Sequence, residues 1–259
     1  MVEVLKGSQT AVAEADIRLI TGDQRSGKSN TGVALAIDDS VKQMDKLITP
    51  TGEFIKAQAL TKEDRKYLMN MGVMPGMHKY AKVFSDDGKQ SKIIKIPNDY
   101  LIGSPVKIFA NFHIYGIANF AFISLVDILQ YMNTELFNDA WILSDESVMT
   151  DARNSMEAGG KLVAIWGATM GKRNAKLCFM VQYASQIELR FRLFAKTRIE
   201  CTYDKVRKLI TVEVKKAGQS TFSYDYYAPN YWRFYDTNEL PQVPQEKIDR
   251  ALAKYYSRK

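Results

Sequence analysis

The chain has 259 residues, of which 46% are hydrophobic and 25% charged, and this balance is that of a globular protein rather than a disordered one. Its net charge of +7 favours a polyanionic partner. The two cysteines, Cys178 and Cys201, lie in apolar runs, which argues against a disulfide framework. No apolar run is long enough to span a bilayer and no signal peptide follows Met1, so we expect a cytoplasmic protein without a membrane span.

Apolar spacing predicts alternating strands and helices along the chain. Strands are predicted at 16–21, 106–112, 139–147, 175–182 and 197–203, and helices at 28–44, 61–72, 123–133, 161–172, 185–196 and 245–256. Two hairpins are predicted, one turning at Asp87–Gly88 and one at Ala217–Gly218. The alternation predicts an α/β fold with a mainly parallel sheet flanked by helices and a C-terminal β-hairpin. We expect one domain over 1–240, followed by a linker and short helix over 241–259.

One stretch between the first strand and the first helix carries a specific motif. Gly22-Asp23-Gln24-Arg25-Ser26-Gly27-Lys28-Ser29 fits the P-loop pattern G-x-x-x-x-G-K-[ST], and Asn30 follows it. Its glycines let backbone N–H groups point at phosphate oxygens, and the helix adds its positive end. Lys28 would reach the β- and γ-phosphates of ATP, and Ser29 would bind Mg²⁺. The alternative is a glycine turn with an incidental lysine, but the flanking strand and helix favour the nucleotide.

A P-loop needs a second acidic site at the end of a neighbouring strand. The run Trp141–Ser144 predicts that strand, and Asp145 and Glu146 follow it. We assign Asp145 to the Mg²⁺ shell and Glu146 to activation of the attacking water. The alternative is a helix N-cap with acids in its first turn. Gln182, which ends another interior strand, is placed to contact the γ-phosphate, unless it only caps the next helix.

Longer segments resemble a known superfamily. "VKIFANFHIYGIANFAFISLVDILQYMNTELFNDAWILSDES", "RNSMEAGGKLVAIWGATMGKRNAKLCFMVQYASQIELRFR", "KTRIEC" and "RFYDTNE" follow one another in the order seen in FtsK/HerA ATPases. The chain resembles viral genome-packaging ATPases and filamentous-phage assembly ATPases, in which a strand ending in asparagine, here Asn111, precedes the Asp-Glu pair. The resemblance covers about 16–239 and implies a RecA/ASCE-like P-loop NTPase fold and ATP hydrolysis.

The sequence departs from these families in three places. "GATMGKRN" stands where they carry a polar Gln-Thr-Arg-like run, and about sixty residues before Asn111 have no clear counterpart. The filamentous-phage ATPases carry a membrane helix, and its absence here favours packaging. The tail after Pro244 is too short for a nuclease domain.

The resemblance also implies a homo-oligomeric ring of five or six subunits, docked on a portal or capsid vertex protein in the host cytoplasm if the chain is viral. One subunit's arginine would then complete its neighbour's site. Arg190 is our first candidate for this arginine and Arg198 the next, with Arg192 also considered. The alternative is that all three are solvated or form salt bridges.

Positive charge is concentrated in the second half of the chain. Residues 161–216 hold thirteen Lys and Arg against four Asp and Glu, a local surplus of nine. Such a surface suits double-stranded DNA tracked through its phosphates without base reading. We expect Arg153, Lys172 and Arg173 to contact DNA, although basic faces are often only solvated.

The sequence therefore predicts an ATP-driven double-stranded DNA translocase, of the genome-packaging kind. One alternative is a P-loop ATPase that powers phage assembly or protein secretion, which DNA would not stimulate. Another is a non-catalytic nucleotide-binding module, which the Asp145-Glu146 pair argues against.

Overall fold

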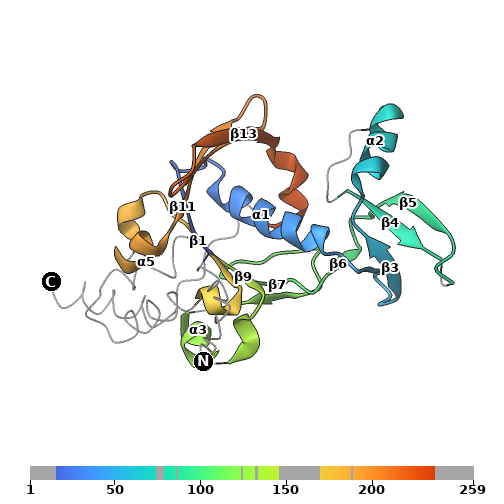
Figure 1. Cartoon of the computed structure of the whole chain (residues 1–259), viewed down its shortest axis with the longest axis horizontal. Helices are drawn as coiled ribbons and strands as arrows, with labels where there is room; N and C mark the ends of the chain where they lie inside the picture. The colour runs from blue at the N-terminus through green and yellow to red at the C-terminus, as the bar shows by residue number, and fades with distance from the viewer. Residues whose placement is uncertain are drawn as a thin grey trace, which may run out of the picture.

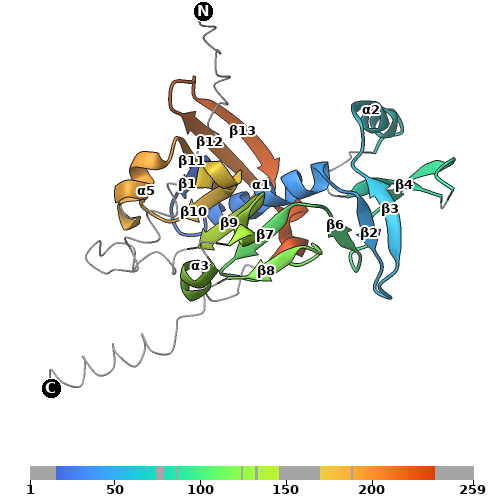
Figure 2. The same ribbon diagram turned by 60° about the horizontal axis from the view of Figure 1, so that its bottom comes forward.

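The computed structural model describes residues 16–73, 79–85, 87–123, 125–131, 134–145, 170–187 and 189–236. Within these ranges, eight strands form one large sheet (Figures 1 and 2). Their order across the sheet is β13 (Phe222–Tyr227), β12 (Leu209–Lys216), β11 (Thr197–Asp204), β1 (Asp16–Thr21), β10 (Lys176–Met180), β9 (Ala140–Asp145), β7 (Lys107–Ala110) and β8 (Phe120–Phe122).

The large sheet is mixed, so it matches the expectation of a mainly parallel sheet with a C-terminal β-hairpin only in part. From β11 to β8 every described pairing is parallel, whereas β12 and β13 add antiparallel strands at one edge. The predicted hairpin is present there, with its turn between Lys216 and Phe222. Strand β10 lies between the P-loop strand β1 and the acid-bearing strand β9, and all three are parallel. The residues that follow them therefore lie together at the C-terminal ends of the strands.

A second, wholly antiparallel sheet occupies 46–103, where the sequence predicted only one hairpin and one helix. Its order is β5 (Ser91–Lys95), β4 (Tyr80–Phe84), β3 (Phe54–Gln58), β2 (Lys46–Ile48) and β6 (Leu101–Gly103). Short turns join β2 to β3 and β4 to β5, and such turns permit only antiparallel pairing. The predicted helix is α2 (Lys62–Asn70), and Thr61 and Asp64 cap it reciprocally.

The remaining helices are α1 (Lys28–Lys42), α3 (Leu125–Tyr131) and α5 (Leu189–Phe194), with short 3-10 turns η1 (Glu135–Phe137), η3 (Met170–Arg173), η4 (Ala184–Gln186), η5 (Ala228–Asn230) and η6 (Trp232–Phe234). Among the described residues, none of the helices has both the length and the apolar character needed to cross a membrane.

Alternating side chains divide the core into two layers, one on each face of the large sheet. Ile20, Cys178 and Leu143 pack on the face that α1 covers, in a cluster that continues into the second sheet. Leu19 and Phe179 face the opposite layer. Because parallel strands buried on both faces are nearly continuous apolar runs, the sequence pattern located them well.

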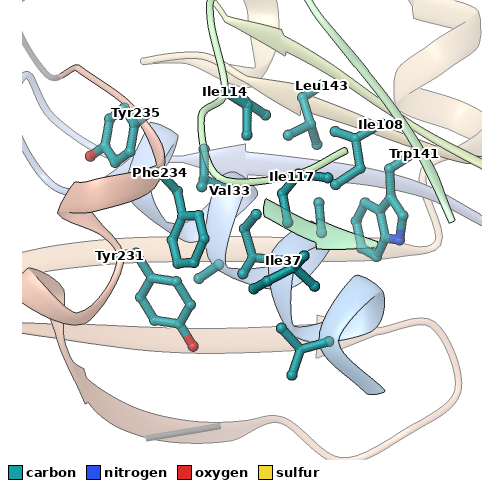
Figure 3. Close-up of a cluster of buried hydrophobic side chains, with 14 of the residues drawn as sticks. Val33, Ile37, Ile108, Ile114, Ile117, Trp141, Leu143, Tyr231, Phe234 and Tyr235 are labelled. Carbon is teal, nitrogen blue, oxygen red and sulfur yellow. The ribbon is translucent and has the colours of Figure 1, made fainter. Parts of the chain in front are cut away.

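The segment after β13 packs across α1. Tyr231 and Phe234 lie beside Val33 and Ile37 of α1 in Figure 3, and Phe234 is fully buried. The Tyr231 hydroxyl donates a hydrogen bond to Asp38 Oδ1 at 2.8 Å. This packing places residues 228–235 beside the start of α1, where the P-loop ends.

Candidate nucleotide site

The P-loop turns between β1 and α1 through three residues with positive φ: Gly22 at 150°, Arg25 at 60° and Gly27 at 93°. A Cβ on Gly27 would lie 2.5 Å from Ile210 Cδ1, and one on Gly22 would lie 2.6 Å from the carbonyl oxygen of Cys201. Both positions therefore need glycine for space as well as for backbone conformation.

Two side chains of the loop are buried within it. Lys28 is 6% exposed, and its Nζ donates hydrogen bonds to the carbonyl oxygens of Gly22 at 3.1 Å and Asp23 at 2.8 Å. The Oγ of Ser26 is buried and has no hydrogen-bond partner in the described part of the chain. A buried hydroxyl without a partner costs stability, and a phosphate oxygen would satisfy it.

The loop meets the acidic strand end directly. Ser29 Oγ donates a hydrogen bond to Asp145 Oδ2 at 2.6 Å, although 116 positions separate the two residues. A serine hydroxyl and a carboxylate are oxygen ligands of the kind that Mg²⁺ takes alongside phosphate and water. The described residues hold no group of three or more His, Cys, Asp or Glu side chains that could bind a metal by themselves. The donor set therefore fits a metal ion shared with phosphate.

Asn111 holds Asp145 in place. Its amide makes two hydrogen bonds of 2.8 Å with the backbone of Asp145, one to the carbonyl oxygen and one from the N–H. Asn111 is 5% exposed, directly after β7, and β7 pairs with β9. The asparagine at the end of this strand thus fixes the backbone of Asp145 without lining the cavity itself.

Asn30 and Thr31, at the start of α1, bind the C-terminal part of the large sheet. The Tyr226 hydroxyl donates to Asn30 Oδ1 at 2.9 Å and lies 3.0 Å from Thr31 Oγ1. Asn30 Nδ2 donates to the carbonyl oxygen of Ala228 at 3.3 Å. Asn30 also lines the cavity, and its predicted contact with a nucleotide stays a prediction.

A cavity of about 470 Å³ opens over the P-loop. Residues 24–30 line one side of it, and Asp145 lies beside them. The remaining wall consists of Tyr203, Ile210, Ala228, Trp232 and Tyr235. Sequence reasoning missed this wall, because its residues come from β11, β12 and the segment after β13. The aromatic cluster Tyr224–Tyr235 was the only available signal.

The other predicted residues of the site lie at varying distances from it. Gln182 follows the C-terminal end of β10 and is half-buried, but it does not line the cavity. Gln186 accepts a hydrogen bond from the N–H of Tyr183 within the short turn that follows, and contact of Gln182 with the γ-phosphate stays a prediction. Glu146 and Arg153 lie outside the described residues, so their roles stay predictions.

Arg192 and Arg198, two of the candidate arginines, do not line this cavity. Arg198 is exposed on β11 and projects from the face opposite Ile199 and Cys201, which pack toward α1. It could act only on a neighbouring subunit. Arg190 and Arg192 both lie in α5, and Arg192 is partly buried.

The basic turn η3 precedes β10 and so lies at the N-terminal ends of the parallel strands, whereas the P-loop lies at their C-terminal ends. Lys172 is exposed there. Arg173 donates hydrogen bonds to the carbonyl oxygen of Thr134 and to Asn138 Oδ1, and its own carbonyl accepts from the N–H of Asp139. Arg173 thus stabilises the turn before β9, and DNA contact by both residues stays a prediction.

Comparisons with known proteins add only distant structural likenesses. No protein-family model and no curated protein matches the sequence. The N-terminal domain of zonular occludens toxin from Neisseria meningitidis is similar in structure, with 13% identity, a TM-score of 0.47, and coverage of 86% of this chain and 100% of that one. ATPases 2 and 3 of EssC from Geobacillus thermodenitrificans are similar at 8% identity and a TM-score of 0.39, over 93% of this chain and 43% of that one. At TM-scores below 0.5, these likenesses establish neither family nor function.

Proposed function

We propose that this chain is a Mg²⁺-dependent nucleoside triphosphatase that uses ATP. The hydrogen bond between Ser29 and Asp145 carries the proposal, because it joins the end of the P-loop to an acidic strand end at the mouth of the cavity. Bound Mg²⁺ would supply positive charge to the phosphates. Ser29 and Asp145 are the side chains that would hold it.

The remaining roles follow from charge and position. Lys28 would exchange the carbonyls of Gly22 and Asp23 for phosphate oxygens, since a buried ammonium binds an anion more strongly than a neutral carbonyl. Asn111 keeps Asp145 in position. Glu146 follows Asp145 directly in the sequence, and we assign it the activation of water.

Phosphate release by the purified chain tests the proposal, with Lys28→Ala, Asp145→Asn and Glu146→Gln as variants. We expect each variant to lose about 100-fold or more of the activity, as removal of a group that stabilises transition-state charge does. ATP should still bind to Glu146→Gln. Hydrolysis that all three variants retain would exclude this site as its source.

We further propose that hydrolysis drives movement of double-stranded DNA, as a ring of subunits that packages a genome through a portal or capsid vertex protein. The surplus of nine positive charges over 161–216 supports this. In the described part of that region, Lys205, Arg207, Lys208, Lys215 and Lys216 are exposed around the β11–β12–β13 turns.

The DNA proposal is tested by ATPase rates with and without long double-stranded DNA at two salt concentrations. Stimulation that falls steeply with salt is expected, because phosphate contacts release counterions. Hydrolysis that depends on Lys28 but is indifferent to DNA would overturn the DNA proposal and favour an ATPase that moves protein.

A further inference from the structure

The wall of the cavity that lies outside the P-loop is aromatic and apolar, apart from Asp145. Tyr203 and Ile210 are directly paired across β11 and β12, so their side chains lie together on one face. Trp232, in η6, and Tyr235 complete this wall. The lining thus combines the P-loop and Lys28 with three aromatic side chains.

We propose that Tyr203 and Trp232 bind the base of the nucleotide by stacking, in a subsite separate from the phosphate cradle. This inference rests on the proposed function and extends it to the part of the ligand that the P-loop does not contact. A nucleoside triphosphate is the class of ligand that has both a polyanionic end for residues 22–29 and an aromatic end for this wall.

The dimensions and exposure of the wall fit this assignment. A cavity of about 470 Å³ lies within the range of small-molecule and cofactor sites. Trp232 is 44% exposed, whereas Trp141 is 2% exposed, so the Trp232 ring is accessible to a ligand. Lys208 Nζ lies 5.9 Å from the Trp232 ring centroid, which orients the indole from outside the cavity.

The wall is built from parts that the fold brings to the loop. Gly27 approaches Ile210 so closely that a Cβ would contact it at 2.5 Å, which fixes the distance between the cradle and β12. Asn30 holds Ala228, and this contact anchors the segment that carries Trp232. Stacking uses the face of the base and does not involve the hydrogen-bonding groups along its edge, which distinguish adenine from guanine. We therefore expect ATP and GTP to bind with similar affinity.

The test compares the binding of MgATP and of magnesium tripolyphosphate by calorimetry in the full chain. Tripolyphosphate carries the phosphate charge without a base. We expect Trp232→Ala to weaken ATP binding about tenfold, as loss of one stacking partner does, and to change tripolyphosphate affinity less than twofold. Trp232→Phe should retain most of the ATP affinity. Phe54→Ala, which removes a 70% exposed ring from the second sheet, is the matched control and should change neither.

Quenching of tryptophan fluorescence supplies a second measurement. ATP should quench the wild-type emission more than that of Trp232→Phe, and tripolyphosphate should quench both equally. Equal weakening of ATP and tripolyphosphate in Trp232→Ala, or no weakening of either, would overturn the base subsite while leaving the P-loop proposal intact. If neither ligand binds the wild-type chain, the proposed function itself fails, and the subsite with it.

Discussion

Asn111 holds Asp145 through both atoms of its amide, donating to the carbonyl oxygen and accepting from the N–H, each at 2.8 Å. Because Asp145 Oδ2 in turn accepts from Ser29, the position of Asp145 beside the P-loop depends on a strand end that is three strands away from the P-loop strand. Asn111 is therefore a positioning residue rather than a ligand.

Asn111→Leu tests this role. The substitution leaves two buried backbone groups without partners, so the free energy of unfolding should fall by about 2 kcal/mol. The Mg²⁺ concentration for half-maximal ATPase activity should also rise about tenfold, because Asp145 is displaced. Asn119→Leu is the matched control, since Asn119 donates to the carbonyl oxygen of Ser104 and does not contact Asp145. If Asn111→Leu lowers the free energy of unfolding but leaves the Mg²⁺ dependence of the ATPase unchanged, Asn111 contributes to stability alone and does not position Asp145.

Gly27→Ala tests the close approach of the P-loop to β12. The new methyl group meets Ile210 at 2.5 Å and the backbone has φ of 93°, so strain and a steric clash add. Gly52→Ala has a similar φ of 85° but nothing within 4 Å, and it measures the backbone cost alone, about 1 kcal/mol. Urea unfolding should show a larger loss for Gly27→Ala. Equal losses would mean that the loop moves away from Ile210 at no cost.

Tyr226→Phe removes the hydroxyl that bonds Asn30 and lies against Thr31. We expect the free energy of unfolding to fall by about 1–2 kcal/mol, because Asn30 Oδ1 loses a donor at a part-buried position. Tyr227→Phe alters the neighbouring, 44% exposed ring and should change stability little. Chemical denaturation of both variants checks this, and similar losses would contradict the role of Tyr226.

Asp39 should make stability depend on pH in the acid range. Burial opposes ionisation of its carboxyl, but hydrogen bonds from Lys176 and Trp141 outweigh this effect and hold its pKa below the usual value. The unfolded chain then binds the proton first, so stability is full above about pH 5 and falls as the pH drops through the carboxyl range.

Asp39→Asn should be less stable at pH 7 and lose less stability between pH 5 and pH 3 than the wild type does. Asp225→Asn, at an exposed position of β13, is the control. Urea unfolding at several pH values makes the comparison, and parallel curves for wild type and Asp39→Asn would show that another group governs the acid range.

The local sequence pattern was enough to predict the buried strands and the helix with a capping box. The buried parallel strands were visible as apolar runs, α2 through its Thr61 and Asp64 capping box, and the P-loop through its glycine spacing. The parallel strand β8 (Phe120–Phe122), which is largely exposed, was not predicted. The second sheet was largely missed, because β2 and β6 are three residues long and pair with each other although β3, α2, β4 and β5 lie between them in the sequence. Such short strands have no periodicity of their own to detect.

The sequence by itself located the P-loop, residues 22–29, and the strand that ends at Asp145, since both depend on short spacings within single segments. Only the tertiary structure decided which other residues line the cavity with the P-loop. Tyr203, Ile210 and Trp232 come from three elements, and they share a cavity with Lys28 because β11 pairs with β1 and β12, and the segment after β13 packs on α1. Contacts between distant segments of this kind arise from sheet order and helix packing, which leave no periodic signal in the residues themselves.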